Sequence, residues 1–291
     1  MEKHFQGMSA EYEPANASVT ISAGLVPGSH RRLYQSRAAP YPGPMQRRFE
    51  ELDHRPTHLG DLSLRRRTIM SLGTNVVEVK LGNEYLMSSL FTESETALGT
   101  AGVEECLTGR ARAAGHLDVL VGGLGLGYTA KAVLDSSAVQ SLLVVELFDA
   151  VVEWHTAGIL PLGTAVAGDP RTRFTVGDFF ARAASPEGFD PDHPGRRFHA
   201  ILLDIDHSPE MLLDPGNVRF YTEEGLRELA GHLLPGGVFG LWSNDPPAPA
   251  FTDRLRQVFS RAEARPVTFR NPLQNRDYTQ SIYLARDIVP D

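Results

Sequence analysis

The sequence carries one run of glycines whose position suits the binding of a nucleoside. Gly123-Leu124-Gly125-Leu126-Gly127 stands between a short apolar segment and a segment with helical spacing. Glycines at such a junction let the backbone turn sharply and approach a ligand, and the start of the helix presents free N–H groups. A glycine turn can also serve only to pack a helix closely on a strand, so the run alone leaves both interpretations open.

Acidic residues follow the next three apolar segments, each where a strand is predicted to end. Glu146 is placed to accept hydrogen bonds from both ribose hydroxyls of an adenosine ligand. Asp178 is placed to accept from an adenine amino group, and Asp204 faces the same crevice at the carboxyl edge of the sheet. Four features in this order predict a nucleoside site. The residues expected to bind the cofactor are Gly123, Leu124, Gly125, Gly127, Glu146, Leu147, Gly177, Asp178, Phe179 and Asp204.

These residues must be positioned by strands that alternate with helices. Such alternation implies right-handed crossovers and an α/β fold, with a mostly parallel sheet and helices on both faces. The predicted strands are Asp118–Val121, Ser141–Val145, Arg173–Val176, Phe198–Leu203 and Val238–Trp242, and the predicted helices are Tyr128–Leu134, Ala150–His155 and Thr222–Leu233.

A small antiparallel sheet is predicted before this domain. Thr68–Leu72 and Val76–Leu81 are the expected strands, with Gly73-Thr74-Asn75 as the turn between them and Tyr85–Leu90 as a third short strand. Helical spacing over Glu93–Cys106 then predicts a helix that leads into the main domain.

Three segments are therefore expected. Residues 1–60 form an irregular arm rich in Pro and Arg, residues 61–106 the small β-subdomain with its linking helix, and residues 107–291 the nucleoside-binding domain. Phe5-Gln6-Gly7 resembles the remnant of a cleaved protease site, so the native protein is expected to begin at Met8.

Composition excludes several classes of protein. Hydrophobic residues make up 42% of the chain, which is enough for a proper core. A formal net charge of -8 argues against nucleic acid as the main partner, because phosphate binding rests on clustered Lys and Arg. Cys106 is the one cysteine, so no intramolecular disulfide can form and a cytoplasmic location is expected. No apolar stretch reaches about 18 residues, so no membrane span is expected.

The segment Asp118–Trp242 resembles the class I S-adenosylmethionine-dependent transferases, and in particular the spermidine/spermine synthase family. Val121 is aliphatic, as in spermidine synthases, where most methyltransferases carry an acid before the glycines. The resemblance covers roughly residues 62–286 and implies a seven-stranded, Rossmann-like sheet, S-adenosylmethionine or its decarboxylated form as cofactor, a small-molecule acceptor and a homodimer. The strings that carry it are VLVGGLGLGYT, VVELFDAVVEW, ILLDIDHSP, NVRFYTEEGL and LLPGGVFGLWS.

The chain departs from this family at three places. Leu126 stands where the synthases carry an aspartate that helps hold the amine of the decarboxylated donor. The family's Asp-Ser-Ser-Asp-Pro segment appears as Asp204-Ile205-Asp206-His207-Ser208-Pro209, which keeps the first acid and displaces the second. The family's glutamine has no clear equivalent near Leu86-Met87. Intact S-adenosylmethionine, with its carboxylate, is therefore expected to be tolerated better than in the synthases.

Alkyl transfer to an amine needs in-line geometry and a group that accepts the amine's proton. Asp204 is the first candidate for orienting or deprotonating the nucleophile, with Asp206 and His207 as further catalytic candidates. Hydrogen bonding at the sheet edge is the alternative role for these three. The residues expected to line the acceptor side are Asn217, Tyr221, Trp242 and Asn244, with core packing as an equal alternative for Trp242. His155 and His232 are expected on helix surfaces, and no metal site is expected.

Four functions remain open from the sequence. The first is transfer of a methyl group, or another alkyl arm of S-adenosylmethionine, to a small-molecule amine. The second is aminopropyl transfer from the decarboxylated donor, and the third is non-catalytic nucleoside binding. A nicotinamide dehydrogenase is weaker, because the turn reads Gly-x-Gly-x-Gly and lacks the Gly-x-Gly-x-x-Gly dinucleotide spacing. Nucleic-acid and membrane partners are not expected.

Overall fold

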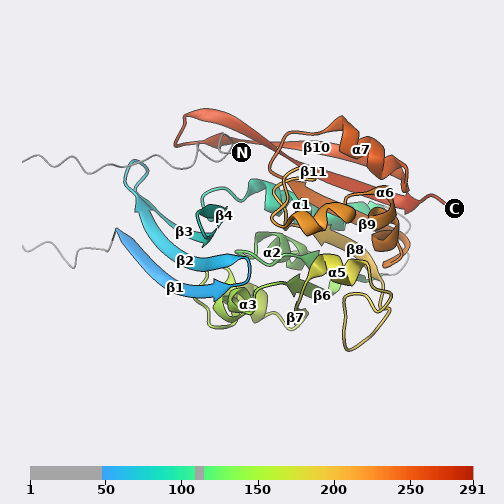
Figure 1. Cartoon of the computed structure of the whole chain (residues 1–291), viewed down its shortest axis with the longest axis horizontal. Coiled ribbons are helices and arrows are strands. Elements are labelled where there is room, and N and C mark those ends of the chain that lie inside the picture. The colour runs from blue at the N-terminus through green and yellow to red at the C-terminus, as the bar shows by residue number, and fades with distance from the viewer. Residues whose placement is uncertain (1–47, 109–114, 291) are drawn as a thin grey trace, which may run out of the picture. The chain divides into compact units, whose positions relative to one another are not determined.

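The computed structural model describes residues 48–108 and 115–290. The predicted arm therefore lies outside the described residues as far as residue 47. Within the described part, a four-stranded antiparallel sheet precedes a seven-stranded sheet with helices (Figure 1). This arrangement confirms the fold expected from the sequence.

The small sheet contains four strands in sequential order, β1-β2-β3-β4. These are β1 (Phe49–Thr57), β2 (Gly60–Ile69), β3 (Thr74–Leu81) and β4 (Glu84–Ser88). In β2, Leu62 and Leu64 are fully buried while their neighbours are less so, which is the alternation of a strand with one face on a core. The expected strand over Thr68–Leu72 ends earlier, at Ile69, and the chain turns over residues 70–73.

Strand β1 corrects the expectation of irregular chain up to residue 60. Its sequence, FEELDHRPT, carries charges and a proline and has no apolar alternation, so no strand was predicted there. Among the described strands, β1 pairs only with β2 and lies at the sheet edge, where such residues are tolerated. Two side-chain contacts connect β1 to the main domain. The Trp154 indole N–H donates to Asp53 at 2.7 Å, and Arg55 pairs with Glu153 at 3.0 Å.

The main sheet has the order β10-β11-β9-β8-β5-β6-β7. Neighbouring strands from β7 to β9 are parallel, and β11 is antiparallel to both β9 and β10. Sequence reasoning located five of these strands and did not place the β10–β11 hairpin. The strands are β5 (Leu117–Gly122), β6 (Val139–Glu146), β7 (Thr172–Val176), β8 (Phe198–Leu203), β9 (Leu233–Ser243), β10 (Phe259–Asn271) and β11 (Arg276–Ile288).

Two hydrophobic cores lie on the two faces of this sheet. Along β5, Val119 and Val121 enter one core and Leu120 enters the other, as the period of a buried strand requires. The first core packs the sheet against α1 (Glu93–Thr108), α2 (Tyr128–Leu134), α3 (Asp149–Thr156) and α4 (Gly163–Ala167), and also takes in the small sheet. The second packs it against α5 (Phe179–Ala183), α6 (Glu223–Ala230) and α7 (Pro249–Arg256). No described helix is long and apolar enough to cross a membrane.

Helix α1 approaches its neighbours closely through a stripe of small residues. Gly99, Gly102 and Cys106 are buried and follow the helical period. A Cβ on Gly99 would lie 2.6 Å from the Thr129 carbonyl oxygen, and one on Gly102 would lie 2.4 Å from Leu202. The same stripe, continued one turn towards the N-terminus, places Glu95 against the carboxyl edge of the main sheet.

We predict that Gly99→Ala destabilises the protein even though alanine is the better helix former. The added methyl group forces α1 and α2 apart, at a cost of about 1–3 kcal/mol, which exceeds the gain in helix propensity of about 1 kcal/mol. Urea denaturation measures the change. Thr100→Ala, on the exposed side of the same helix, is the matched control and should leave stability nearly unchanged. A Gly99→Ala protein more stable than the parent would contradict this packing argument.

Candidate active site

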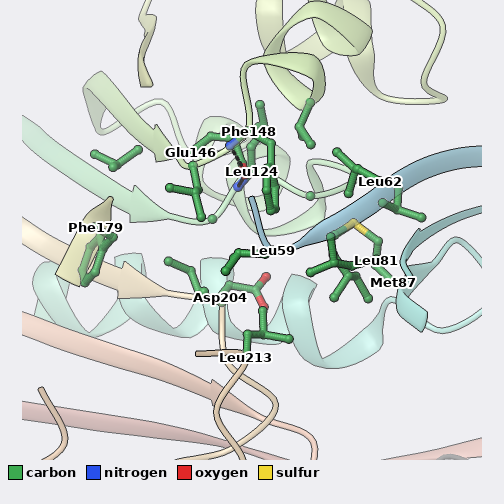
Figure 2. Close-up of a pocket in the computed structure, with 18 of the residues that line it drawn as sticks. Leu59, Leu62, Leu81, Met87, Leu124, Glu146, Phe148, Phe179, Asp204 and Leu213 are labelled. Carbon is green, nitrogen blue, oxygen red and sulfur yellow. Dashed lines mark hydrogen bonds between the residues drawn. The ribbon is translucent and has the colours of Figure 1, made fainter. Parts of the chain in front are cut away.

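A pocket opens at the carboxyl edge of the parallel strands, beside the β5–α2 turn (Figure 2). Strand β5 pairs with β6 on one side and β8 on the other, so the chain order reverses here. Open α/β sheets bind ligands at such a point. The small sheet closes the pocket from the opposite side. Among the lining residues are His58, Leu59, Leu62, Val79, Leu81, Leu86, Met87, Glu95, Tyr128, Glu146, Leu147, Phe148, Asp178, Phe179, Asp204, His207, Leu213, Asp214, Asn217 and Trp242.

The glycine turn forms one wall of this pocket, with Gly123, Leu124, Gly125, Leu126 and Gly127 all lining it. Gly123 has a φ of 89°, in the left-handed region, and a Cβ there would lie 2.1 Å from the Asp204 carbonyl oxygen. No side chain fits between the β5 and β8 loops at this position. The turn therefore packs the two loops together and also lines the pocket with its backbone, while its binding of a nucleoside stays a prediction.

Glu146 ties the glycine turn to the next loop. One carboxylate oxygen accepts from the Leu124 N–H at 2.8 Å and the other from the Phe148 N–H at 2.9 Å. The side chain is 7% exposed and lines the pocket, and burial raises its pKa. The Gly125 and Leu147 backbones also stabilise the charged carboxylate, so Glu146 holds both loops at the pocket wall.

Asp178 caps helix α5 at the rim of the same pocket. Its Oδ1 accepts from the N–H groups of Phe180 at 2.8 Å and Ala181 at 3.2 Å, which is ordinary N-capping. Gly177, Phe179 and Leu147 lie beside it on the lining. All ten residues expected to bind the cofactor thus line one pocket.

Asp204 and Glu95 form a pair of carboxyl groups at the base of the pocket. Thr129 Oγ1 donates to Asp204 Oδ2 at 2.7 Å and lies 3.2 Å from the Glu95 carbonyl oxygen. Burial raises the pKa of Asp204 to about 6. Burial and then the charge of Asp204 raise the pKa of Glu95 to about 8. Both groups can therefore take up a proton near neutral pH.

Sequence reasoning missed Glu95, although a signal for it exists. Glu95, Gly99, Gly102 and Cys106 share one helical stripe, and the last three are buried. An acid on a stripe of small buried residues is unusual, because charged groups rarely enter an interior without a partner or a function.

A chain of hydrogen-bonded polar side chains lies next to Glu95. The Trp242 indole N–H donates to Ser94 Oγ at 2.8 Å, and Ser94 Oγ lies 2.6 Å from Gln280 Oε1. Gln280 Nε2 donates in turn to Asn244 Oδ1 at 2.9 Å. Ser94 Oγ also lies 2.8 Å from Glu95 Oε2. Ser94 has one proton, which it can donate to either Gln280 Oε1 or Glu95 Oε2, and its bond to Glu95 partly offsets the rise in the pKa of that group.

Asp206 organises the loop over the pocket and does not line it. Its carboxylate accepts from Tyr221 Oη at 2.8 Å, the Leu213 N–H at 2.7 Å and Asn217 Nδ2 at 3.3 Å. Burial raises the pKa of Asp206. Burial also raises the pKa of Tyr221, and the neighbouring Asp206 raises it further. Asp206 thereby positions Leu213 and Asn217, which do line the pocket together with His207.

Asp206, Tyr221 and Asn244 are not among the described residues that line the pocket, and each has a side-chain hydrogen bond elsewhere. Their expected roles in catalysis and acceptor binding stay predictions. The expectation for two histidines is corrected. His155 and His232, expected on helix surfaces, are 0% and 7% exposed. His155 Nε2 lies 2.9 Å from the Gly125 carbonyl oxygen, and burial lowers its pKa, so the neutral ring steadies the glycine turn as a donor.

The lining is acidic. It contains five carboxylic acids, and none of the described lining residues is Lys or Arg. The acids are Glu95, Glu146, Asp178, Asp204 and Asp214. The described residues also contain no group of three or more His, Cys, Asp and Glu side chains that could hold a metal ion. The site thus favours a ligand that carries positive charge.

We predict that the carboxyl pair makes the stability of the ligand-free protein depend on pH. Because the folded-state pKa of Glu95 lies above that of an ordinary glutamate, its contribution is complete below about pH 4.5 and is lost as the pH rises towards 8. Glu95→Gln removes this loss. Relative to the parent, the variant should gain at least about 1 kcal/mol of unfolding free energy between pH 5 and pH 9, one pKa unit being about 1.4 kcal/mol.

Urea denaturation at a series of pH values measures this difference. Glu104→Gln, at an exposed position of the same helix, is the matched control and should show no such trend. Parallel pH profiles for the parent and Glu95→Gln would contradict a raised pKa.

Known structures share this architecture. No family model matches the sequence. A spermidine synthase in complex with the transition-state analogue AdoDATO aligns with a TM-score of 0.61 at 17% identity, over 81% of this chain and 73% of that one. The spermidine synthase from Thermotoga maritima gives 0.60 at 17% identity, over 81% and 72%. A probable spermidine synthase from Corynebacterium glutamicum gives 0.53 at 18%, over 82% and 80%. The chain therefore shares the fold of these spermidine synthase structures.

Proposed function

We propose that this protein is a transferase that uses S-adenosylmethionine, or a close derivative, to alkylate the nitrogen of a small-molecule amine. The observation that carries the proposal is the acidic pocket at the point where the strand order reverses. It combines the glycine turn, Glu146 and the Asp204–Glu95 pair in one lining, whose described residues include no Lys or Arg.

The charges of the pocket support a sulfonium donor over a dinucleotide. S-Adenosylmethionine brings a sulfonium and an ammonium group, which five surrounding acids favour. A nicotinamide dinucleotide would bring its pyrophosphate against the same acids with no described lining cation to pair with it. We assign Glu146 to the ribose, and Asp178 and Phe179 to the base.

The donor, when bound, supplies an electrophilic carbon on its sulfonium. The chain's own residues then orient the acceptor and take its proton. Asp204 and Glu95 lie at the base of the pocket, and their raised pKa values suit a group that accepts a proton near neutral pH. Trp242, held through its indole N–H by Ser94, forms the adjoining wall.

Aminopropyl transfer is the second candidate, because the two best-matching structures named above are spermidine synthases. Leu126 weighs against it. This side chain is 4% exposed, lines the pocket and offers no acceptor to the amine of a decarboxylated donor. Intact S-adenosylmethionine is therefore the donor we favour.

Isothermal titration calorimetry separates these alternatives. We expect S-adenosylmethionine and S-adenosylhomocysteine to bind and NAD to give no heat of binding. Tight binding of decarboxylated S-adenosylmethionine alone would establish the second candidate. Firm binding of S-adenosylhomocysteine without transfer to any amine would indicate a nucleoside-binding protein, and NAD binding alone would overturn the proposal.

We further predict that Asp204→Asn lowers kcat by about 10²–10⁴-fold, the usual contribution of a general base. The Kd for S-adenosylhomocysteine should change only a few-fold, because the amide oxygen can still accept from Thr129. Steady-state kinetics and calorimetry measure the two effects. Asp253→Asn, on the exposed surface of α7, is the control and should retain full activity. A fully active Asp204→Asn enzyme would exclude Asp204 as the base.

A further inference from the structure

The end of the pocket away from Phe179 is built from aliphatic side chains of the small sheet. Figure 2 shows Leu62, Leu81 and Met87 gathered at this end, with Phe179 at the opposite end and Asp204 between them. Leu62 is fully buried, whereas Leu81 and Met87 are only half-buried and offer apolar surface to a ligand. Leu86 lines the same pocket from β4.

The small sheet contributes no acid to this end. The described lining residues from its strands and turns include His58 and Ser88 as polar groups, and the rest named above are aliphatic. Glu78, the buried acid of β3, is occupied by Arg65 at 2.9 Å and Arg67 at 2.8 Å and does not line the pocket. A cation at the aliphatic end would lose its hydration without gaining a partner there.

All five lining acids come from outside the small sheet. We assign Glu146 and Asp178 to the nucleoside half, and Glu95 and Asp204 to the base between the two halves. Asp214, on the loop after β8, accepts from the Gly216 N–H at 2.8 Å. In-line displacement places the nucleophile opposite the departing sulfur, hence on the side of the transferred carbon away from the nucleoside. With the nucleoside at Glu146 and Asp178, the acceptor nitrogen falls near Glu95 and Asp204. The remainder of the acceptor then extends along Leu81, Leu86 and Met87.

We infer that the acceptor is a monoamine with an alkyl or aromatic body, and not a diamine or polyamine. This inference rests on the proposed function and specifies its substrate class. The amine nitrogen is held and deprotonated at the carboxyl pair, and its apolar body is desolvated against the aliphatic end of the pocket. In the transfer, the nitrogen lone pair forms the new N–C bond, the C–S electron pair stays on sulfur as a thioether, and the displaced proton passes to Asp204.

The test is binding of amines to the complex with S-adenosylhomocysteine, which requires no turnover. Calorimetry is run with hexylamine, phenethylamine and putrescine at one pH. Hexylamine or phenethylamine should bind at least about tenfold more tightly than putrescine, because burying apolar area is favourable and a second ammonium has no partner. Tighter binding of putrescine, or binding of none of the amines, would overturn the inference. If S-adenosylhomocysteine itself does not bind, the result contradicts the proposed function, and the inference that rests on it is contradicted too.

A charge placed at the aliphatic end gives an independent check. Leu86→Glu, or Met87→Glu if the first does not fold, should reverse the preference towards putrescine, because its second ammonium then gains a carboxylate. Leu273→Glu, on the exposed β10–β11 turn, is the matched control and should keep the preference of the parent. An unchanged preference in the pocket variant, with S-adenosylhomocysteine still bound, would show that this end does not contact the acceptor.

Discussion

The two hydrogen bonds accepted by Glu146 set the geometry of the site. They join the backbone of the turn after β5 to the backbone of the turn after β6, so neither loop can shift without losing a bond to a buried carboxylate. His155 adds a contact from α3 to the same turn at Gly125. The close approach of Gly123 to the Asp204 backbone then fixes the β8 loop against the first two. These contacts fix the loops around the pocket without a bound ligand.

The second constraint is the glycine stripe of α1. Because Gly99 and Gly102 let this helix lie close to α2 and to β8, its first turn reaches the carboxyl edge of the sheet. Glu95 consequently shares a desolvated space with Asp204, and burial followed by the charge of Asp204 raises the pKa of Glu95. The packing of α1 against α2 thereby affects the protonation of the groups assigned to chemistry.

The spacing of apolar residues and the turn residues between segments predicted most of the main domain. Buried parallel strands are continuous apolar runs, and the helices between them have clear boundaries. Tyr128–Leu134 and Phe198–Leu203 were located to the residue. Strand β1 was not predicted, because an edge strand needs little hydrophobicity.

The acids that follow successive strands predicted three residues of one pocket, Glu146, Asp178 and Asp204. Which acids face that pocket was beyond a local pattern: Asp206 follows Asp204 by two residues, yet its carboxylate is used by Tyr221 and the backbone of its own loop. Glu95 required knowledge of which helix packs beneath the sheet edge.

The Trp154–Asp53 hydrogen bond gives the protein an optical consequence. The chain has two tryptophans, Trp154 and Trp242. Trp154 is buried where β1 meets α3, whereas Trp242 lines the pocket beside the carboxyl pair. Intrinsic fluorescence therefore has one emitter that senses the junction of the small sheet with the main domain and one that senses ligands. Replacing either tryptophan with phenylalanine leaves a single emitter, so occupancy of the pocket and separation of the small sheet can be followed independently in the same protein.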